Sequence, residues 1–402
     1  MACVIAAPSS SSGKTLLSLL LISWARFKGK SIQPFKVGPD YLDPQLLSVA
    51  SKRPCRNLDL ILSNKSWVEK SFRKHSESAD LTLIEGVMGL FDGVGSTDKG
   101  STASVAKQLN LPIVLIINAH GQAASLAPLV KGFRDQEPSL RVAGVVLNQV
   151  NSERHKKLLE EVLSSIDIQV LGSIPKNPNL VLPSRYLGLI PAHEIIDLEK
   201  RIEIWGEIAE KHLSMDKFHN LLKAPTTKIS SIISEKDIPK EESLTNEYPI
   251  AIAQDKAFHF RYPETKEHLE ALGMPLIIWR PTEDEPIPIK CKGLIIPGGF
   301  PEQFAKEIST ASRSLKSLKS FYGKFPIYAE CGGMLLLGHS IKDLNGERNL
   351  MTGLLPFEAK IGNLQVGYRQ LTSLGNSLIL NKGDQINGHE FHRWDIEIIK
   401  TN

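Results

Sequence analysis

The chain has 402 residues, enough for two or three domains, and its 42% hydrophobic and 23% charged residues are ordinary for a globular protein. A net charge of +4 without a clustered basic stripe argues against a nucleic-acid-binding protein, and no apolar stretch is long enough to span a membrane. The four cysteines show no C-x-x-C spacing and the first residues form no basic leader, so we expect a cytoplasmic protein with reduced thiols.

Short apolar runs alternate with amphipathic stretches in the first half of the chain. Residues 2–7, 81–85, 112–118 and 142–148 predict buried strands, and helical patterns such as residues 14–28 follow them. Continuous buried strands separated by helices are typical of a parallel sheet with helices on both faces. We therefore predict an α/β first domain over residues 1–222.

The segment SSSSGKT, residues 9–15, follows the first predicted strand and opens a helix, which is the context of a phosphate-binding P-loop. In such a loop Lys14 would reach the β- and γ-phosphates of ATP, and the Thr15 hydroxyl would hold Mg²⁺. The usual pattern has a glycine where Pro8 stands, and a serine-rich turn before a helix is the alternative interpretation. The predicted nucleotide-binding residues are Ser12, Gly13, Lys14 and Thr15.

Acidic residues follow several predicted strands and are candidate metal or catalytic groups. Glu85 ends the strand LTLIE, Asp92 lies in the glycine-rich loop after it, Asp40 and Asp43 lie in FKVGPDYLDP, and Asp59 lies in NLD. Parallel α/β sheets bind ligands at the carboxyl ends of their strands. Each aspartate by itself is equally compatible with a helix cap or a turn. Taken together, they predict a metal and phosphate site.

Asn148 ends the predicted strand GVVLN. At the end of a parallel strand its side chain could read the adenine ring of ATP. A simple turn residue is the equally weighted alternative.

Residues 223–247 are polar and rich in charge, which predicts an interdomain linker. The α/β alternation restarts at residues 250–253, and strands and turns predominate after about residue 351. We predict a second, α/β domain over residues 248–402.

Cys331 directly follows an apolar strand in PIYAECGGML and precedes two glycines and a helical run. This order is typical of a nucleophile elbow, and the helix N-terminus there would lower the thiol pKa. Backbone N–H groups of Gly299, in LIIPGGFPE, and of Gly332 are candidates for an oxyanion hole. A buried structural thiol is the alternative, and we assign that role to Cys3, Cys55 and Cys291.

Two histidines, His389 and His392, lie in NGHEFHRW. Their odd separation places them on opposite faces of a strand. One of them could line the thiol site, and a structural hydrogen-bonding role is equally compatible.

The motifs SSSSGKT, FKVGPDYLDP, NLD, IEGVMGLFDG, GVVLNQV, LPSRYLGLIPAHE, PGGFPE, AECGGM and GHEFH resemble, in order and over nearly the whole chain, the cobyrinate a,c-diamide synthases of cobalamin biosynthesis. The first domain is then similar to dethiobiotin synthetase, and the second to class I, triad-type glutamine amidotransferases.

The resemblance implies amidation of the a and c carboxylates of a corrin macrocycle, with ATP, glutamine or ammonia, and an acyl-phosphate intermediate. It implies that Lys14, Thr15 and Glu85 handle ATP and Mg²⁺, with Asp59 as a further metal candidate. Cys331 would carry a glutamyl thioester. The carboxylate-activating site would contain Asp40, Tyr41, Leu42, Asp43 and Asp92.

Other functions stay open at this point. Cobyric acid synthases usually show Tyr-Glu-Ile-His where this chain has His389-Glu390-Phe391-His392, which favours the a,c-diamide enzyme. An enzyme that acts on hydrogenobyrinate or nickel-sirohydrochlorin is barely excluded by the sequence. From other classes, a P-loop ATPase switch would dimerise with nucleotide, and a glutamine sensor would have lost ligase activity. A homodimer is an expectation that the sequence leaves open.

The family resemblance also places the histidine of the catalytic triad after the GHEFH-like motif, beyond the position where this sequence ends at Asn402. We therefore expect a second domain that is short at its C-terminus, with exposed sheet edge and weak glutaminase activity that leaves the protein dependent on free ammonia, since an activating base contributes roughly 10²–10⁴-fold. A truncated form of a longer protein is the alternative, and His389 or His392 in the role of the base is the rival interpretation.

Overall fold

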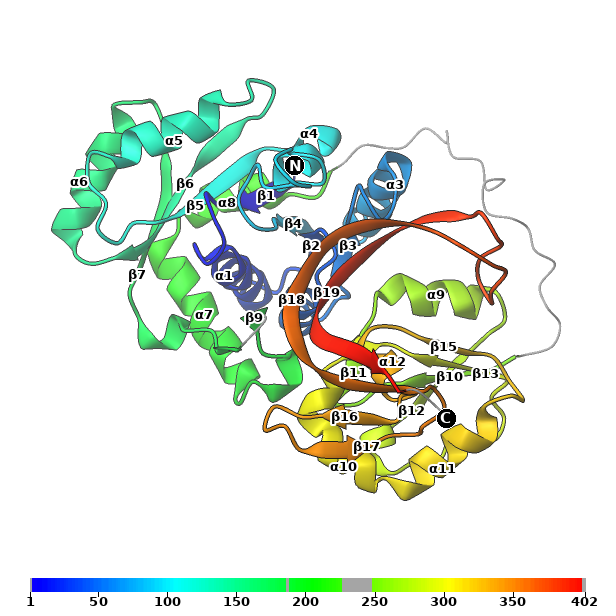
Figure 1. Cartoon of the computed structure of the whole chain (residues 1–402). Helices are drawn as coiled ribbons and strands as arrows, with labels where there is room; N and C mark the ends of the chain where they lie inside the picture. The colour runs from blue at the N-terminus through cyan, green and yellow to red at the C-terminus, as the bar shows by residue number, and fades with distance from the viewer. Residues whose placement is uncertain (1, 186–187, 226–247, 400–402) are drawn as a thin grey trace. The chain divides into compact units, whose positions relative to one another are not determined.

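The computed structural model describes residues 2–185, 188–225 and 248–399 (Figure 1). The chain forms two compact units, Met1–Lys228 and Ile229–Asn402, which are described separately below. Most of the predicted linker, residues 226–247, lies outside the described residues.

The first unit is built on a parallel sheet of seven strands in the order β3-β2-β4-β1-β5-β6-β7. This confirms the predicted parallel α/β sheet. Its order brings β1 between β4 and β5, so the loops that follow β1, β2 and β4 leave neighbouring positions at one edge of the sheet. The strands are β1 (Cys3–Ala6), β2 (Ile32–Val37), β3 (Arg56–Leu58), β4 (Leu81–Glu85), β5 (Ile113–Asn118), β6 (Val142–Val150) and β7 (Val170–Pro175).

Helices cover both faces of this sheet, because alternate strand residues point to opposite sides. In β1, Cys3 and Ile5 join one hydrophobic cluster, together with α1, α2, α7 and α8. Val4 and Ala6 join a second cluster, together with α3 to α6. The helices are α1 (Lys14–Phe27), α2 (Leu42–Ser51), α3 (Lys65–Ser76), α4 (Thr102–Leu109), α5 (Leu126–Asp135), α6 (Glu153–Ser164), α7 (Leu198–His212) and α8 (Met215–Leu222).

The second unit contains a parallel four-stranded sheet in the order β12-β10-β13-β15, with a small antiparallel pair, β11 with β14, beside it. A single hydrophobic cluster forms its core. The strands are β10 (Ile250–Ala253), β11 (Phe258–Phe260), β12 (Leu276–Trp279), β13 (Gly293–Ile296), β14 (Gly298–Gly299) and β15 (Ile327–Ala329), and the helices are α9 (Pro263–Ala271), α10 (Ala305–Thr310), α11 (Ser312–Phe321) and α12 (Gly332–Leu335).

A second sheet, in the order β17-β16-β18-β19, completes this unit and confirms the strands predicted after residue 351. Its longest elements, β18 (Phe357–Thr372) and β19 (Gln385–Ile398), pair antiparallel and form one curved ribbon in Figure 1. Phe357 and Ala359 near the start of β18 are buried, whereas Val366 and Leu371 further along are about half exposed. The shorter strands are β16 (Ser340–Lys342) and β17 (Arg348–Leu350).

None of the helices in the described ranges combines the length and apolar character that a bilayer span requires.

Helix α1, which follows the P-loop directly, is buried along most of its length, and this allows a stability test. Leu20 is fully buried in α1, whereas Phe27, at the end of the same helix, is 60% exposed. We expect Leu20→Ala to lower the unfolding free energy of the first unit by about 2–5 kcal/mol and Phe27→Ala to change it by less than about 0.5 kcal/mol. Hydrogen exchange measured by mass spectrometry reports peptides of the first unit separately. Equal losses of protection in the two variants would contradict the packing of α1.

Candidate nucleotide and thiol sites

The loop between β1 and α1 has the backbone geometry that its unusual sequence requires. Gly13, which precedes α1, has φ 115°, a left-handed value that favours glycine. A Cβ atom at this position would lie 2.4 Å from Asn148 Nδ2 and 3.1 Å from Ile116 Cδ1. The single glycine of the loop therefore stands where both conformation and space demand it.

Lys14, the first residue of α1, is held by carbonyl groups on both sides of the loop. Its ammonium group donates to Ser9 O at 3.3 Å and to Met88 O at 2.5 Å. Burial, and then repulsion from Lys36, lower the pKa of Lys14 to about 8. A P-loop lysine is suited to donate to phosphate oxygens, which are acceptors like these two carbonyl groups.

An ion-pair cluster lies beside this loop, centred on the buried ammonium of Lys36 in β2. Lys36 Nζ lies 2.5 Å from Asp43 Oδ2, 2.8 Å from Glu85 Oε1 and 3.6 Å from Asp40 Oδ2. The Thr15 hydroxyl lies 2.8 Å from the same Glu85 oxygen and 3.4 Å from Asp43. The structure thus brings together four predicted site residues: Thr15 from α1, Asp40 from the β2–α2 loop, Asp43 from the first turn of α2 and Glu85 from β4.

The sequence places Lys36 with Asp40 and Asp43 around one turn in FKVGPDYLDP, but it does not predict that the lysine is buried. A lysine in an apolar strand is ordinarily exposed at one end of its side chain, whereas Lys36 is only 2% exposed. Its position within the apolar run IQPFKV, which forms β2, was the available signal, because a buried lysine must meet carboxylates.

Burial and charge act in opposite directions on the carboxylates of this cluster. Burial, and then the neighbouring Asp43, raise the pKa of Asp40 to about 7. Burial raises the pKa of Glu85 as well, against the effect of Lys36. Burial alone would raise the pKa of Asp43, but the attraction and hydrogen bond of Lys36 hold it below its usual range. The cluster therefore contains one firmly ionised carboxylate and two that resist ionisation.

The residues around Glu85 fit a hard divalent cation. Its Oε2 atom is buried and has no hydrogen-bond partner within the described part of the chain, so one carboxylate oxygen is left for a ligand. The Thr15 hydroxyl donates to the other oxygen, Glu85 Oε1, at 2.8 Å and lies 3.4 Å from Asp43 Oδ2, and oxygen atoms are the ligands that Mg²⁺ prefers. Among the described residues no group of three or more His, Cys, Asp or Glu side chains forms a metal cage. A Mg²⁺ ion bound with phosphates needs only one or two protein carboxylates.

Asp40, Tyr41 and Leu42 form the entry to α2. Asp40 Oδ1 accepts hydrogen bonds from Leu42 N at 2.9 Å and Asp43 N at 3.3 Å, which shapes the start of the helix. Tyr41 precedes the helix, and the Leu42 side chain is buried. Asp40 thus has both the capping role that the sequence left open and a place beside Lys36, and the substrate roles of Tyr41 and Leu42 stay predictions.

Asp59 and Asp92 each organise a turn. Asp59 Oδ1 accepts hydrogen bonds from Ile61 N at 2.8 Å and Leu62 N at 2.9 Å after β3. Asp92 Oδ2 accepts from Gly89 N at 2.7 Å within the glycine-rich loop that follows β4. These contacts agree with the turn alternative for both residues, and the metal role of Asp59 and the catalytic role of Asp92 stay predictions.

The thiol site has the strained backbone of a nucleophile elbow. Cys331 lies between β15 and α12 with φ 46°, a value that costs a non-glycine residue of the order of 1–3 kcal/mol. A Cβ atom on Gly333 would lie 2.1 Å from Ile296 O. The second glycine after the cysteine is therefore required by the close approach of β13.

The predicted oxyanion-hole residues lie side by side next to this thiol. A Cβ atom on Gly332 would lie 3.2 Å from Gly299 N, and one on Gly298 would lie 3.4 Å from Cys331 Cβ. The loop PGGF is thus packed directly against the elbow. The role of the Gly299 and Gly332 N–H groups toward an oxyanion stays a prediction.

The predicted lowering of the Cys331 pKa is wrong in direction. Desolvation by the surrounding elements raises the pKa of the thiol, although the side chain reaches solvent, and the Gly332 N–H only partly opposes this effect. Glu302 and Glu330 raise the pKa further. Helix α12 spans only Gly332–Leu335, so its dipole is small compared with these contributions.

The two histidines of the GHEFH motif lie on opposite faces of β19, as predicted. His389 pairs with Tyr368 of β18, and His392 pairs with Gln365, three positions along the ladder. The ring of His389 packs edge-on against Tyr368 at 5.1 Å, and His392 Nδ1 lies 3.1 Å from Trp394 O. These contacts agree with the structural alternative for the pair.

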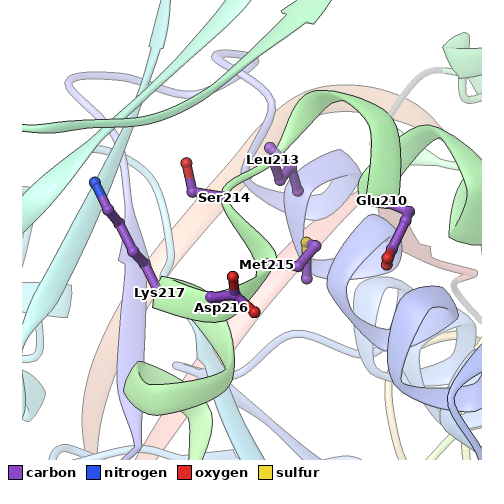
Figure 2. A pocket seen from close by; sticks show the side chains of 6 residues that line it. All are labelled: Glu210, Leu213, Ser214, Met215, Asp216 and Lys217. Carbon is purple, nitrogen blue, oxygen red and sulfur yellow. The ribbon is translucent and has the colours of Figure 1, made fainter.

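A pocket of about 460 Å³ lies elsewhere on the first unit, where α7 ends and α8 begins. Figure 2 shows that the side chains of Glu210 and Lys217 point away from each other instead of converging on one ligand position. Glu210 accepts a hydrogen bond from Trp24 Nε1 at 2.6 Å, which ties it to α1. This pocket contains none of the predicted site residues; its lining is Glu210, Leu213, Ser214, Met215, Asp216 and Lys217.

The free oxygen of Glu85 generates a prediction about metal-dependent binding. We expect Glu85→Gln to weaken nucleotide binding in the presence of Mg²⁺ by at least roughly tenfold, since it removes the charge of a ligand, and to leave binding in EDTA unchanged. Isothermal titration calorimetry with ADP measures both. Glu77→Gln, on the exposed end of α3, is the control. Equal weakening with and without Mg²⁺ would show that the carboxylate supports the fold of the loop instead of a metal.

The raised pKa of Cys331 generates a second prediction. Of the four cysteines, all within the described ranges, Cys331 alone is exposed, so iodoacetamide should label it and Cys331→Ser should remove the label. Only the thiolate reacts with iodoacetamide, and the pKa of Cys331 lies above the ordinary cysteine value of 9.0. The labelling rate should therefore keep rising above pH 9.0. Peptide mass spectrometry over a pH series measures the rate, and a plateau below pH 9 would show an already activated thiol.

Comparisons with known proteins identify a domain family in each of the two units. Residues 3–189 match the model of the CobQ/CobB/MinD/ParA nucleotide binding domain, and residues 249–398 match that of the CobB/CobQ-like glutamine amidotransferase domain. Among solved structures, the MinD cell division protein of Aquifex aeolicus is 16% identical with a TM-score of 0.35, covering 55% of this chain and 94% of that one.

Curated relatives extend over almost the entire sequence. The cobyrinate a,c-diamide synthase of Synechococcus sp. is 39% identical over 98% of this chain and 86% of its own length. That of Caldanaerobacter subterraneus subsp. tengcongensis is 39% identical over 99% of this chain and 87% of its own length. With a parallel α/β nucleotide-binding unit and a thiol elbow where the two domain models match, the chain belongs to the family of cobyrinate a,c-diamide synthases.

Proposed function

We propose that this protein is an ATP-dependent amidoligase that converts the a and c carboxylates of cobyrinate into amides. The observation that carries the proposal is the cluster of Thr15, Lys36 and Glu85 beside the P-loop, in a chain whose second unit bears an exposed elbow thiol. The first site suits phosphoryl transfer, and the second suits release of ammonia from glutamine.

In the activation step a substrate carboxylate oxygen attacks the γ-phosphorus of ATP, and the bond to the β,γ-bridging oxygen breaks. The products are an acyl-phosphate and ADP. Lys14 and Lys36 supply positive charge next to the transferring group, which is the main contribution a protein makes to this reaction. Thr15 and Glu85 would hold Mg²⁺, with Asp43 close by; when bound, the ion neutralises phosphate charge.

A substrate carboxylate that is to be phosphorylated must approach the ammonium groups of Lys14 and Lys36. Asp40 and Asp43 lie beside the ammonium group of Lys36 and both pair with it, as Glu85 does. Burial raises the pKa of Asp40 to about 7. A protonated Asp40 would donate a hydrogen bond to an incoming carboxylate instead of repelling it. This arrangement supports a role for the loop before α2 in accepting an acidic substrate.

The nitrogen comes from glutamine or free ammonia. The thiolate of Cys331 attacks the side-chain amide carbon of glutamine, and the N–H groups of Gly299 and Gly332 hold the oxyanion. The amide nitrogen then takes up the proton that the thiol lost, the C–N bond breaks and ammonia leaves. Water then hydrolyses the glutamyl thioester to glutamate and restores the thiol. Because the pKa of Cys331 is raised, this attack requires a base that accepts its proton. Ammonia finally displaces phosphate from the acyl-phosphate, which forms the amide.

The substrate assignment rests on the relatives, which are named for cobyrinate. Hydrogenobyrinate and nickel-sirohydrochlorin carry similar carboxylates on related macrocycles and are the competing substrates. The direct test incubates the protein with ATP, Mg²⁺, ammonium chloride and each macrocycle, and follows ADP formation together with product mass. Two amides on cobyrinate support the proposal, and ADP formation without amide product from any of the three would refute it.

Cys331→Ser separates the two half-reactions. We expect it to abolish glutamine-dependent amidation, whatever the wild-type rate, and to leave ammonia-dependent amidation within about twofold, because ammonia bypasses the thiol. Lys14→Ala should abolish amidation with either nitrogen source. Cys291→Ala, which removes a buried thiol of the same unit, is the matched control. Loss of ammonia-dependent activity in folded Cys331→Ser protein would place the thiol in the synthetase site instead.

A further inference from the structure

Asn148 makes a contact that its predicted role in reading adenine does not explain. The side chain is 5% exposed at the end of β6, and its Nδ2 group donates to Ser12 O at 3.0 Å. Ser12 lies in the P-loop, two residues before the phosphate-binding Lys14. The amide therefore contacts the backbone of the loop that would hold the triphosphate.

The orientation of this amide is determined by its own strand. Asn148 Oδ1 accepts a hydrogen bond from Gln149 N at 2.9 Å, so the carbonyl side of the amide is occupied and the NH₂ side faces Ser12. Gln149 has φ 59°, and the ladder between β6 and β7 is irregular at this point. A bulge of this kind redirects side chains at strand ends. The opposite amide orientation would set one oxygen against the Ser12 carbonyl and lose both hydrogen bonds.

The peptide between Ser12 and Gly13 is thus constrained from two sides. Its carbonyl oxygen accepts a hydrogen bond from Asn148. On the other side of the peptide, a Cβ atom added at Gly13 would lie only 2.4 Å from Asn148 Nδ2, so no larger residue fits there. The C=O and N–H bonds of a trans peptide point in opposite directions. Holding the Ser12 carbonyl toward β6 therefore turns the Gly13 N–H away from β6, free to donate to a phosphate oxygen as P-loop N–H groups do.

We propose that Asn148 is a positioning residue for the triphosphate: it fixes the Ser12–Gly13 peptide so that the Gly13 N–H is presented to phosphate, and it does not select the base. This inference rests on the proposed ATP site and adds a function for a residue outside the loop. It predicts that Asn148 affects every nucleoside triphosphate equally, because the groups that it orders meet only phosphate.

The chain offers a matched control for this residue. Asn118, at the end of β5, is the direct register partner of Asn148 on the neighbouring strand. Its side chain is exposed, and its Oδ1 accepts a hydrogen bond from His120 N instead of contacting the P-loop. Asn118→Ala thus removes the same side chain from the same level of the sheet.

The experiment measures the affinities of ATP, GTP and inorganic tripolyphosphate, each with Mg²⁺, for the full chain by calorimetry. We expect Asn148→Ala to weaken all three by roughly tenfold or more, the effect of losing a buried hydrogen bond, with the ATP-to-GTP affinity ratio unchanged. Asn118→Ala should change none of them. Asn148→Leu, which keeps a similar volume and removes the donor without adding charge, should behave like the alanine variant, and it replaces that variant if the latter does not fold.

Two results would overturn the proposal. One is an unchanged tripolyphosphate affinity with a collapsed ATP-to-GTP ratio in the Asn148 variants, which would make the residue an adenine reader. The other is unchanged binding of all three ligands. Failure of the proposed ATP site is distinguishable from both, because wild-type protein would then bind none of the three ligands; failure of the amidoligase function alone would leave these affinities unchanged.

Discussion

The buried ammonium of Lys36 is the interaction on which the nucleotide site depends. Burying carboxylates is costly unless an opposite charge accompanies them, and Lys36 accompanies Asp40, Asp43 and Glu85. Even with Lys14 nearby, these three acidic groups exceed the two ammonium groups when all are ionised. The structure relieves that excess by raising the pKa of Asp40 to about 7. The Glu85 oxygen without a hydrogen-bond partner in the described part of the chain is then the group left to meet a divalent cation, beside which a nucleotide phosphate would enter.

The cluster exists because of strand order. Thr15 lies in the helix that follows β1, Lys36 is the residue before the last in β2, and Glu85 ends β4; these three strands are neighbours in the sheet although they are far apart in sequence. The loop after β4 is tied to the same edge, since Gly86 N donates to Ile5 O and Met88 O accepts from Lys14. On the other side of β1, Asn148 contacts the P-loop from β6. The nucleotide loop is therefore supported from both directions by strand ends, which is a rigid way to hold a catalytic segment.

The thiol site relies on close backbone approach instead of charge. Glycines at positions 299, 332 and 333 let the elbow pack against β13 and β14, and the strain at Cys331 persists because these contacts determine the backbone around it. The same close packing removes water from the thiol and raises its pKa. The elbow exposes the Cys331 side chain but does not ionise its thiol. A proton acceptor is therefore needed to form the thiolate.

The sequence by itself determined the features that are local or periodic: the parallel α/β sheet from its buried apolar runs, the P-loop from its place between a strand and a helix, the elbow from Cys331 and its glycines, and the opposite faces of His389 and His392 from their odd spacing. Only the tertiary structure decided which groups meet. The burial of Lys36, the contact of Asn148 with Ser12 and the raised pKa of Cys331 all depend on strand order and desolvation. Those are properties of elements distant in sequence, and only the burial of Lys36 has a local signal, its position within the run IQPFKV.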